Sequence, residues 1–445
     1  MQPIRHLKET PLLSSRTLQP ETDRVRILIF FYSVCMVPVG ICASDDPAQL
    51  KQFDRVAVSA IDSTLTPNAQ AKKSFELGRL HFEKAEWRLA ENAFTESLKA
   101  ESGFSADILF YLARTEVALR KFDEANETLD KLEQREGHSV RVLCTRALSQ
   151  FAAGDVPVAI ETATAAIKQQ PDHSYAFYVR GLAYLANRDP ASALADFSRA
   201  ECGAESDFGI SGVTLALNRA KALEALGRTR ESTMAVLEAR DMEPESLEAL
   251  AAYWHCQRRD GYLPEALQTA KLALEFHPKE ERAIQIAAIS YAENEEFAAA
   301  LRHAKTWAAI APSSPAAQRL LCQSYFACDE TASALKILAD MLAKEPNDTW
   351  ARSEKALILA MSSKTKEQRQ EAQQLTDALP DSGDMAAWCW LVKAIAWLAD
   401  DPRKATVCLG KADTLNMSPR HRHYLRQVRT RLKLANAKNA TEPQI

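Results

Sequence analysis

The chain has 445 residues, of which 47% are hydrophobic and 26% are charged, so it is long enough to bury a large core. Only 13 residues are glycine, against a usual share of about 7%, which favours a helix-rich protein with few irregular loops. The formal net charge of −4 is small for this length and predicts neither a nucleic-acid-binding protein nor a strongly acidic one.

The first feature along the chain is an apolar run at 27–43, ILIFFYSVCMVPVGICA, with arginines before it and acidic residues after it. This pattern predicts that residues 1–43 are a secretory signal peptide cleaved after Ala43, because the run is short for a membrane span of about 20 residues. The leader before the run is long, and Ile41 is bulky for its place near the cleavage site. A signal anchor, or a true start at Met36 that gives a cytosolic protein, are the alternatives.

A polar lead-in at 44–70 is followed by a repeat of 34 residues. Proline cannot continue a helix, so prolines spaced by one repeat length predict that a helix ends near each of them. The spacing, extended by matches of small residues, predicts ten repeats over 71–419. The prolines that define it are Pro244, Pro278, Pro312, Pro346 and Pro380, and the repeats begin at 71, 106, 140, 174, 213, 247, 281, 315, 349 and 386.

Small residues recur at fixed places within these repeats. Position 8 is usually Ala or Gly, and position 20 is Ala in eight of the ten expected repeats. Two antiparallel helices that face each other at positions 8 and 20 approach closely only if both side chains are small. Position 20 reads Ala90, Ala125, Ala159, Ala193, Ser232, Ala266, Ala300, Ala334, Gln368 and Ala405.

The repeat at 174–207 carries the fullest motif: Gly181, Tyr184, Ala193, Phe197 and Ala200. In spacing and residue type it resembles the tetratricopeptide repeat family. The resemblance implies an all-α fold, a right-handed superhelical solenoid of α-α hairpins. It also implies that positions 2, 5, 9 and 12 of each first helix line a concave binding surface.

Some segments depart from the pattern. Gln368 at position 20 and Lys393 at position 8 predict distortion of the last two repeats. An insertion at 208–212 predicts either a hinge, a loop that contacts a partner, or a tolerated surface insertion.

The C-terminal segment predicts one more helix. An apolar stripe predicts a solvating helix at 420–438 that closes the array, followed by a disordered tail at 439–445. The basic residues of this helix favour a solvated face, with an anionic partner or a membrane surface as the alternative.

The seven cysteines after residue 43 are scattered, odd in number and never spaced as CxxC. They favour small apolar core residues over a disulfide framework or a zinc site. The chain also lacks the common motifs of hydrolases, nucleotide-binding proteins and metalloproteases. We therefore expect no enzyme activity, no catalytic residue, no metal site and no cofactor.

The expected function lies in the concave surface. Arginine and aromatic side chains are common anchors of protein interfaces, although several of these rings could instead be buried between repeats. Trp390 and Trp397 are seven residues apart on one helix, so they are expected either as a pair of exposed anchors or as packing residues. The candidate surface comprises Phe75, Arg79, Phe82, Phe110, Arg114, Tyr175, Tyr178, Lys221, His255, Arg258, Arg282, Arg319, Gln323, Phe326, Trp350, Trp390 and Trp397.

These observations predict a non-catalytic scaffold that binds a partner protein or peptide. By resemblance to exported proteins of the family, we expect an extracytoplasmic protein that serves envelope assembly or secretion. No nucleic-acid partner is expected, and membrane contact is expected only through an uncleaved N-terminal segment. A cytosolic adaptor, a regulatory subunit of an enzyme complex and a self-assembling structural array are the alternatives.

Overall fold

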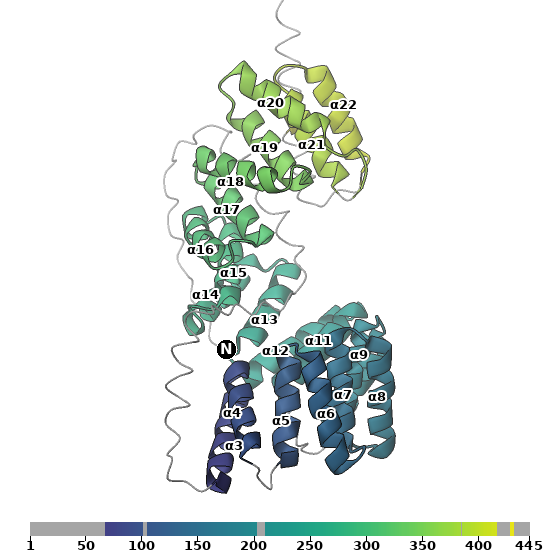
Figure 1. Ribbon diagram of the computed structural model, residues 1–445. Coiled ribbons are helices and arrows are strands. Elements are labelled where there is room, and N and C mark those ends of the chain that lie inside the picture. Colours follow the sequence, from purple (N-terminus) through teal and green to yellow (C-terminus); the bar gives the residue numbers. More distant parts are fainter. Residues whose placement is uncertain (1–66, 101–104, 203–209, 384, 416–427, 431–445) are drawn as a thin grey trace, which may run out of the picture. The chain divides into compact units, whose positions relative to one another are not determined.

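The structure is a computed structural model that describes residues 67–100, 105–202, 210–383, 385–415 and 428–430 (Figure 1). Throughout these residues the regular secondary structure is helical, which confirms the expected all-α class. The expected signal peptide, nearly all of the polar lead-in and the C-terminal tail lie outside the described residues. The chain divides into two compact units, which we describe separately.

The N-terminal unit, Gly40–Tyr262, stacks its helices in chain order, and each hairpin packs its second helix against the first helix of the next. Its first helices are α3 (Pro67–Glu83), α5 (Ser105–Ala118), α7 (Val140–Ala153), α9 (Ser174–Ala186), α11 (Gly212–Ala225) and α13 (Leu247–Arg259). Its second helices are α4 (Trp87–Lys99), α6 (Phe122–Glu136), α8 (Val156–Gln169), α10 (Pro190–Cys202) and α12 (Thr229–Met242).

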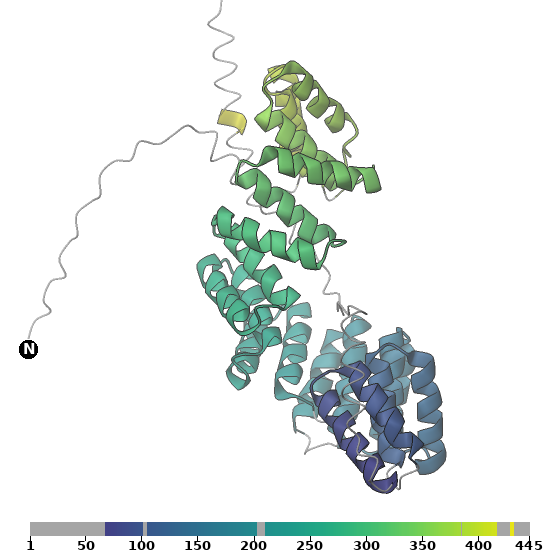
Figure 2. The same ribbon diagram turned by 60° about the vertical axis from the view of Figure 1, so that its left-hand side comes forward.

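The described part of the C-terminal unit begins with α14 (Leu263–Phe276). The same stacking of hairpins follows, as a second view shows (Figure 2). Its first helices are α15 (Glu281–Glu293), α17 (Pro315–Ala327), α19 (Thr349–Ser362) and α21 (Ala386–Trp397). Its second helices are α16 (Phe297–Ile310), α18 (Thr331–Lys344), α20 (Lys366–Asp377) and α22 (Pro402–Asp413). The division between the units therefore falls between the two helices of the sixth expected repeat.

The small residues at position 20 are buried, as their spacing predicted. Ala90, Ala193 and Ala300 have no exposed surface. The exception is Gln368, which is exposed and accepts a hydrogen bond from the Lys364 backbone N–H at 3.0 Å, next to the N-terminus of α20. Its hairpin still forms, because α19 packs against α20. Gln368 at position 20 therefore changes the contact at the N-terminus of α20, but the α19–α20 hairpin still forms.

Position 24 explains which small residue stands at position 8. A Cβ built on Gly78 would lie 2.5 Å from the Phe94 ring, and one built on Gly181 would lie 2.6 Å from the Phe197 ring. In the second repeat the corresponding pair is Ala113 and Leu129, both fully buried. A phenylalanine at position 24 thus requires glycine at position 8, whereas a smaller leucine leaves room for alanine.

We expect Gly181→Ala to lower the free energy of unfolding by about 1–3 kcal/mol, because the new methyl group overpacks the Phe197 ring. On an uncrowded helix the same change usually stabilises by roughly 1 kcal/mol, so the sign is informative. Adding Phe197→Leu should restore most of the loss, since it recreates the Ala113–Leu129 pair. Chemical denaturation followed by circular dichroism measures both variants. A stabilising Gly181→Ala would contradict the crowding.

The turn inside each hairpin has one backbone feature that the sequence does not reveal. Position 15 has a positive φ in the first eight repeats, whether it is glycine, as at Gly154 (φ 99°), or not, as at Glu295 (φ 62°). The next backbone N–H bonds the carbonyl five residues back, for example Glu296 to Tyr291 at 2.9 Å. Ser363 of the ninth repeat has a φ of −60° instead, so that turn has a different geometry.

We expect Gly227→Ala to cost about 1–2 kcal/mol, because its φ of 72° is unfavourable for any residue with a Cβ. No atom lies within 4 Å of the added Cβ, so the loss is one of backbone conformation alone. Gly410→Ala is the control, since Gly410 lies within α22 and its Cβ would also meet no atom. That variant should be stabilised by up to about 1 kcal/mol. Equal effects in the two variants would contradict the turn geometry.

Candidate functional site

The first helices of successive hairpins lie next to one another in each unit. In the N-terminal unit each of α3, α5, α7, α9 and α11 contacts the next first helix, up to α13, and in the C-terminal unit α15 contacts α17 and α19 contacts α21. Positions 2, 5, 9 and 12 of these helices are the places that the sequence predicts for partner binding. We call the surface that they form in each unit the first-helix face.

Six of the predicted aromatic anchors are covered by their neighbours. Their exposed fractions are 9% or less, so these rings contribute to packing and offer little surface to a partner. They are Phe75, Phe110, Tyr175, Phe326, Trp350 and Trp390. Half-buried members are Arg79, Phe82, Arg114, Tyr178, Arg258, Arg319 and Trp397, while Lys221, His255 and Arg282 are exposed. These six rings therefore follow the alternative in which rings are buried between repeats, and partner binding at the other positions stays a prediction.

Trp390 is one of the six covered rings. It packs in the core cluster of the last two hairpins, and its indole Nε1 donates to the Asp381 carbonyl oxygen at 3.3 Å. The Lys393 and Lys411 ammonium groups lie 4.3 and 4.1 Å from the ring centre. Trp397 is half-buried, with the Lys404 ammonium 3.3 Å from its ring centre. Two exposed indoles are therefore absent, and the packing alternative describes Trp390.

Arg114 joins the aromatic rings of three first helices in the N-terminal unit. Its guanidinium carbon lies 4.9 Å from the Phe82 ring centre, 5.4 Å from Phe110 and 5.7 Å from Tyr175. Such cation–π contacts stabilise partly buried arginine. Tyr111, outside the predicted set, has its ring centre 5.4 Å from that of Phe82. The rings and Arg114 thus hold α3, α5 and α9 together.

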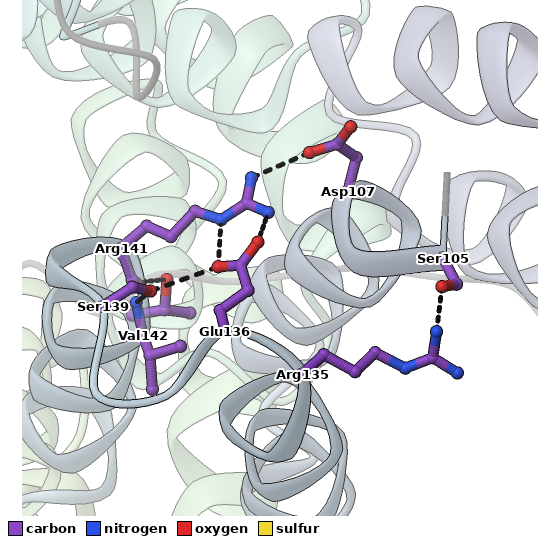
Figure 3. Close-up of polar contacts among 8 residues, drawn as sticks. Ser105, Asp107, Arg135, Glu136, Ser139, Arg141 and Val142 are labelled. Carbon is purple, nitrogen blue, oxygen red and sulfur yellow. Dashed lines mark hydrogen bonds and ion pairs between the residues drawn. The ribbon is translucent and has the colours of Figure 1, made fainter. Parts of the chain in front are cut away.

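Arg141 at position 2 of the third repeat forms a polar network that the sequence analysis missed (Figure 3). Its Nη1 donates to Asp107 at 2.8 Å and its Nε donates to Glu136 at 2.6 Å, while its guanidinium lies 5.2 Å from the Phe110 ring centre. Hydrogen bonds to Glu136 raise the pKa of Arg141 above its usual range. Because both carboxylates are paired with this arginine, the network mainly connects α5, α6 and α7. The signal available in the sequence was opposite charge at position 2 of adjacent repeats.

A short polar chain lies across α9 and α11. The Asn218 amide donates to the Tyr178 hydroxyl at 3.3 Å, and the Lys221 ammonium donates to the Asn218 carbonyl oxygen at 3.2 Å. Burial raises the pKa of the Tyr178 hydroxyl. Lys221 is exposed, so this series of hydrogen bonds ends in a cation on the first-helix face of the N-terminal unit.

The C-terminal unit holds a different polar cluster between α17 and α19. Gln323 is 3% exposed, Trp350 3% and Glu354 2%, and the Arg319 guanidinium carbon lies 4.9 Å from the Trp350 ring centre. Buried atoms of all four side chains have no hydrogen-bond partner within the described structure. Each such atom ordinarily costs about 1–3 kcal/mol. We call Arg319, Gln323, Trp350 and Glu354 the α17/α19 cluster.

Burial raises the pKa of Glu354 to about 8, while the close approach of the polar Gln323 side chain to the carboxyl group and the positive charge of Arg319 oppose this shift. The carboxyl group is therefore mostly neutral at pH 7. Asp348 lies 3.6 Å from Arg319 Nη2 and also caps α19 by accepting from the Trp350 backbone N–H at 2.9 Å. The cluster thus combines one paired cation with a neutral carboxyl group.

The described residues contain no group of three or more His, Cys, Asp or Glu that could hold a metal ion. None of the helices that the structure describes is long and apolar enough to cross a membrane. Cys144, Cys256, Cys322, Cys389 and Cys408 are free and buried, and Cys328 is half-buried.

Comparison with known protein families agrees with the hairpin architecture. A family model described as tetratricopeptide repeat matches residues 75–138 and 144–208, and a second model with the same description matches 291–358. Both units of the chain therefore contain tetratricopeptide repeats. No curated protein matches the chain.

Solved structures with similar folds include several tetratricopeptide repeat proteins. One from Parabacteroides merdae is 16% identical, with a TM-score of 0.40, over 57% of this chain and 98% of its own. YrrB, described as having an unusual peptide-binding site, is 19% identical with a TM-score of 0.33, over 42% of this chain and 95% of its own. A chain of the Cut9–Hcn1 assembly is 10% identical with a TM-score of 0.49, over 75% of this chain and 60% of its own.

Proposed function

We propose that the protein is a non-catalytic scaffold that binds an extended segment of a partner protein on its first-helix face. The observation that carries the proposal is the unbroken contact of α3, α5, α7, α9, α11 and α13, which gives the N-terminal unit one continuous face. Lys221 on this face is exposed, and Arg79 and Tyr178 are half-buried, so side chains suited to a protein interface remain reachable. In the C-terminal unit, Arg282 supplies a further exposed cation.

We infer that the scaffold is exported and serves envelope assembly or secretion, on the sequence pattern of residues 27–43 alone. A cytosolic adaptor and a regulatory subunit of an enzyme complex are the alternatives. Both alternatives use the same binding face, so a test of binding is independent of location.

Binding can be tested with a peptide selected from a random-sequence library against the full chain, with affinity measured by fluorescence polarisation. We expect the double variant Lys221→Glu and Arg282→Glu to weaken binding by about tenfold or more, roughly 1.4 kcal/mol, because it replaces one exposed cation on the first-helix face of each unit by a negative charge. The control is Lys168→Glu with Lys336→Glu, which reverses exposed cations on the second helices α8 and α18. Loss of binding in the control alone would place the ligand on the second helices.

A further inference from the structure

The α17/α19 cluster contains more hydrogen-bonding capacity than its own residues use. Arg319 Nε, Gln323 Nε2 and Oε1, Trp350 Nε1 and Glu354 Oε1 are buried without a partner in the part of the chain that the structure describes. Most buried polar atoms in folded proteins are paired, so several unpaired atoms at one place call for a ligand or ordered water.

Helical spacing brings these groups together. Arg319 and Gln323 are four residues apart on α17, and Trp350 and Glu354 are four residues apart on α19, so each pair lies on one face of its helix. Phe326 of α17 packs with Trp350 and Ile358 of α19 in one apolar cluster, which holds the Trp350 ring in place. Arg319 is the most exposed member, with 29% of its side chain accessible, so a ligand would have to reach the cluster beside it.

The charges disfavour an anionic ligand. Desolvation keeps the Glu354 carboxyl group mostly neutral at pH 7, and the positive charge of Arg319 already has Asp348 at 3.6 Å. A carboxylate would therefore bring a second negative charge into a poorly solvated place. The unpaired atoms include both donors and acceptors, so a matching ligand group must also supply both.

We propose that the α17/α19 cluster is a subsite for one uncharged amide group, either a peptide bond or the carboxamide of an Asn or Gln side chain. The amide oxygen accepts from Trp350 Nε1 and Arg319 Nε, and the amide N–H donates to Gln323 Oε1 or Glu354 Oε1. The subsite rests on the proposed function, because it binds one amide group of a partner segment that lies on the first-helix face of the C-terminal unit.

The test uses the full chain with 15N-labelled tryptophan indoles, and Trp350→Phe assigns the Trp350 resonance. The probes are N-methylacetamide for a peptide bond, propionamide for a carboxamide and acetate for a carboxylate. Each is titrated to about 100 mM, since a ligand this small binds weakly. We expect a saturable shift of the Trp350 indole proton with an amide at a concentration at least tenfold below any effect of acetate. The amide with the lower midpoint identifies the source of the group.

Gln323→Leu should abolish the saturable shift, whereas the control Gln285→Leu, at position 5 of α15, should retain it. If Gln323→Leu fails to fold by circular dichroism, the wild-type titration still decides the matter. A lower midpoint for acetate, or no saturable shift with any probe, would overturn the subsite. Either result leaves the proposed function standing if the selected peptide still loses affinity in the Lys221→Glu and Arg282→Glu variant, so the two failures are distinguishable.

Discussion

Raising the pH from about 4 to about 9 should destabilise the folded chain through Glu354. Its pKa is about 8 in the folded state against an ordinary 4.5, because burial disfavours the carboxylate. Below pH 4.5 the group is protonated in both states and has no effect on stability. Between pH 4.5 and 8 the unfolded chain loses the proton that the folded chain keeps, so stability falls as the pH rises. The full loss corresponds to about 5 kcal/mol.

Glu354→Gln should remove this dependence, since a carboxamide does not ionise. We expect the variant to match the wild type near pH 4 and to exceed its stability by up to about 5 kcal/mol above pH 8. Urea denaturation at several pH values measures the difference, which cancels the contributions of other titrating groups. Glu275→Gln, at an exposed position on α14, is the control and should leave the pH dependence unchanged. A constant difference between wild type and Glu354→Gln across this range would contradict a buried, neutral carboxyl group.

Replacing Trp390 by alanine should lower the free energy of unfolding by about 3–5 kcal/mol, because a large ring leaves a cavity in the core of the last two hairpins. The change also leaves the Lys393 ammonium without its contact to the ring at 4.3 Å. That ammonium is bonded to the Leu379 carbonyl oxygen at 3.0 Å and to Asp381 at 2.6 Å, so it stays in place beside the cavity. Thermal and chemical denaturation followed by circular dichroism measure the loss.

The control for Trp390→Ala is Val407→Ala on α22, where the side chain is 60% exposed. It should change stability by no more than about 0.5 kcal/mol. If Trp390→Ala instead leaves the melting curve unchanged and abolishes binding of the selected peptide, Trp390 is an exposed anchor after all. The contact with the Asp381 carbonyl oxygen would then be absent in solution.

Contacts between the two helices of one hairpin account for most of the fold that could be predicted from the sequence. A period of 34 residues with small side chains at positions 8 and 20 is sufficient to indicate a stack of α-helical hairpins. Gly181 and Ala193 illustrate the reason, because both lie inside one hairpin whose helices are close in sequence. The residues that form such a contact repeat together, so their spacing is visible in the chain.

The functional face could be predicted less well. Position 5 holds Phe75, Phe110 and Trp390, which all proved buried, although the same position holds the half-buried Tyr178. Repeat position alone does not decide this, because coverage of a first helix also depends on side chains of the hairpins before and after it. The α17/α19 cluster was found only in part for the same reason: Arg319, Gln323 and Trp350 were on the predicted surface, whereas Glu354 at position 6 was not.

The sequence by itself determined the fold class, the positions of the hairpins and the presence of tetratricopeptide repeats, because these depend on contacts that recur at a constant spacing. Only the tertiary structure showed the division into two units after Tyr262 and the burial of Trp390. It also paired the unused polar groups of α17 with those of α19. These features depend on contacts between hairpins, where the contacting residues differ from one repeat to the next and leave no periodic signal.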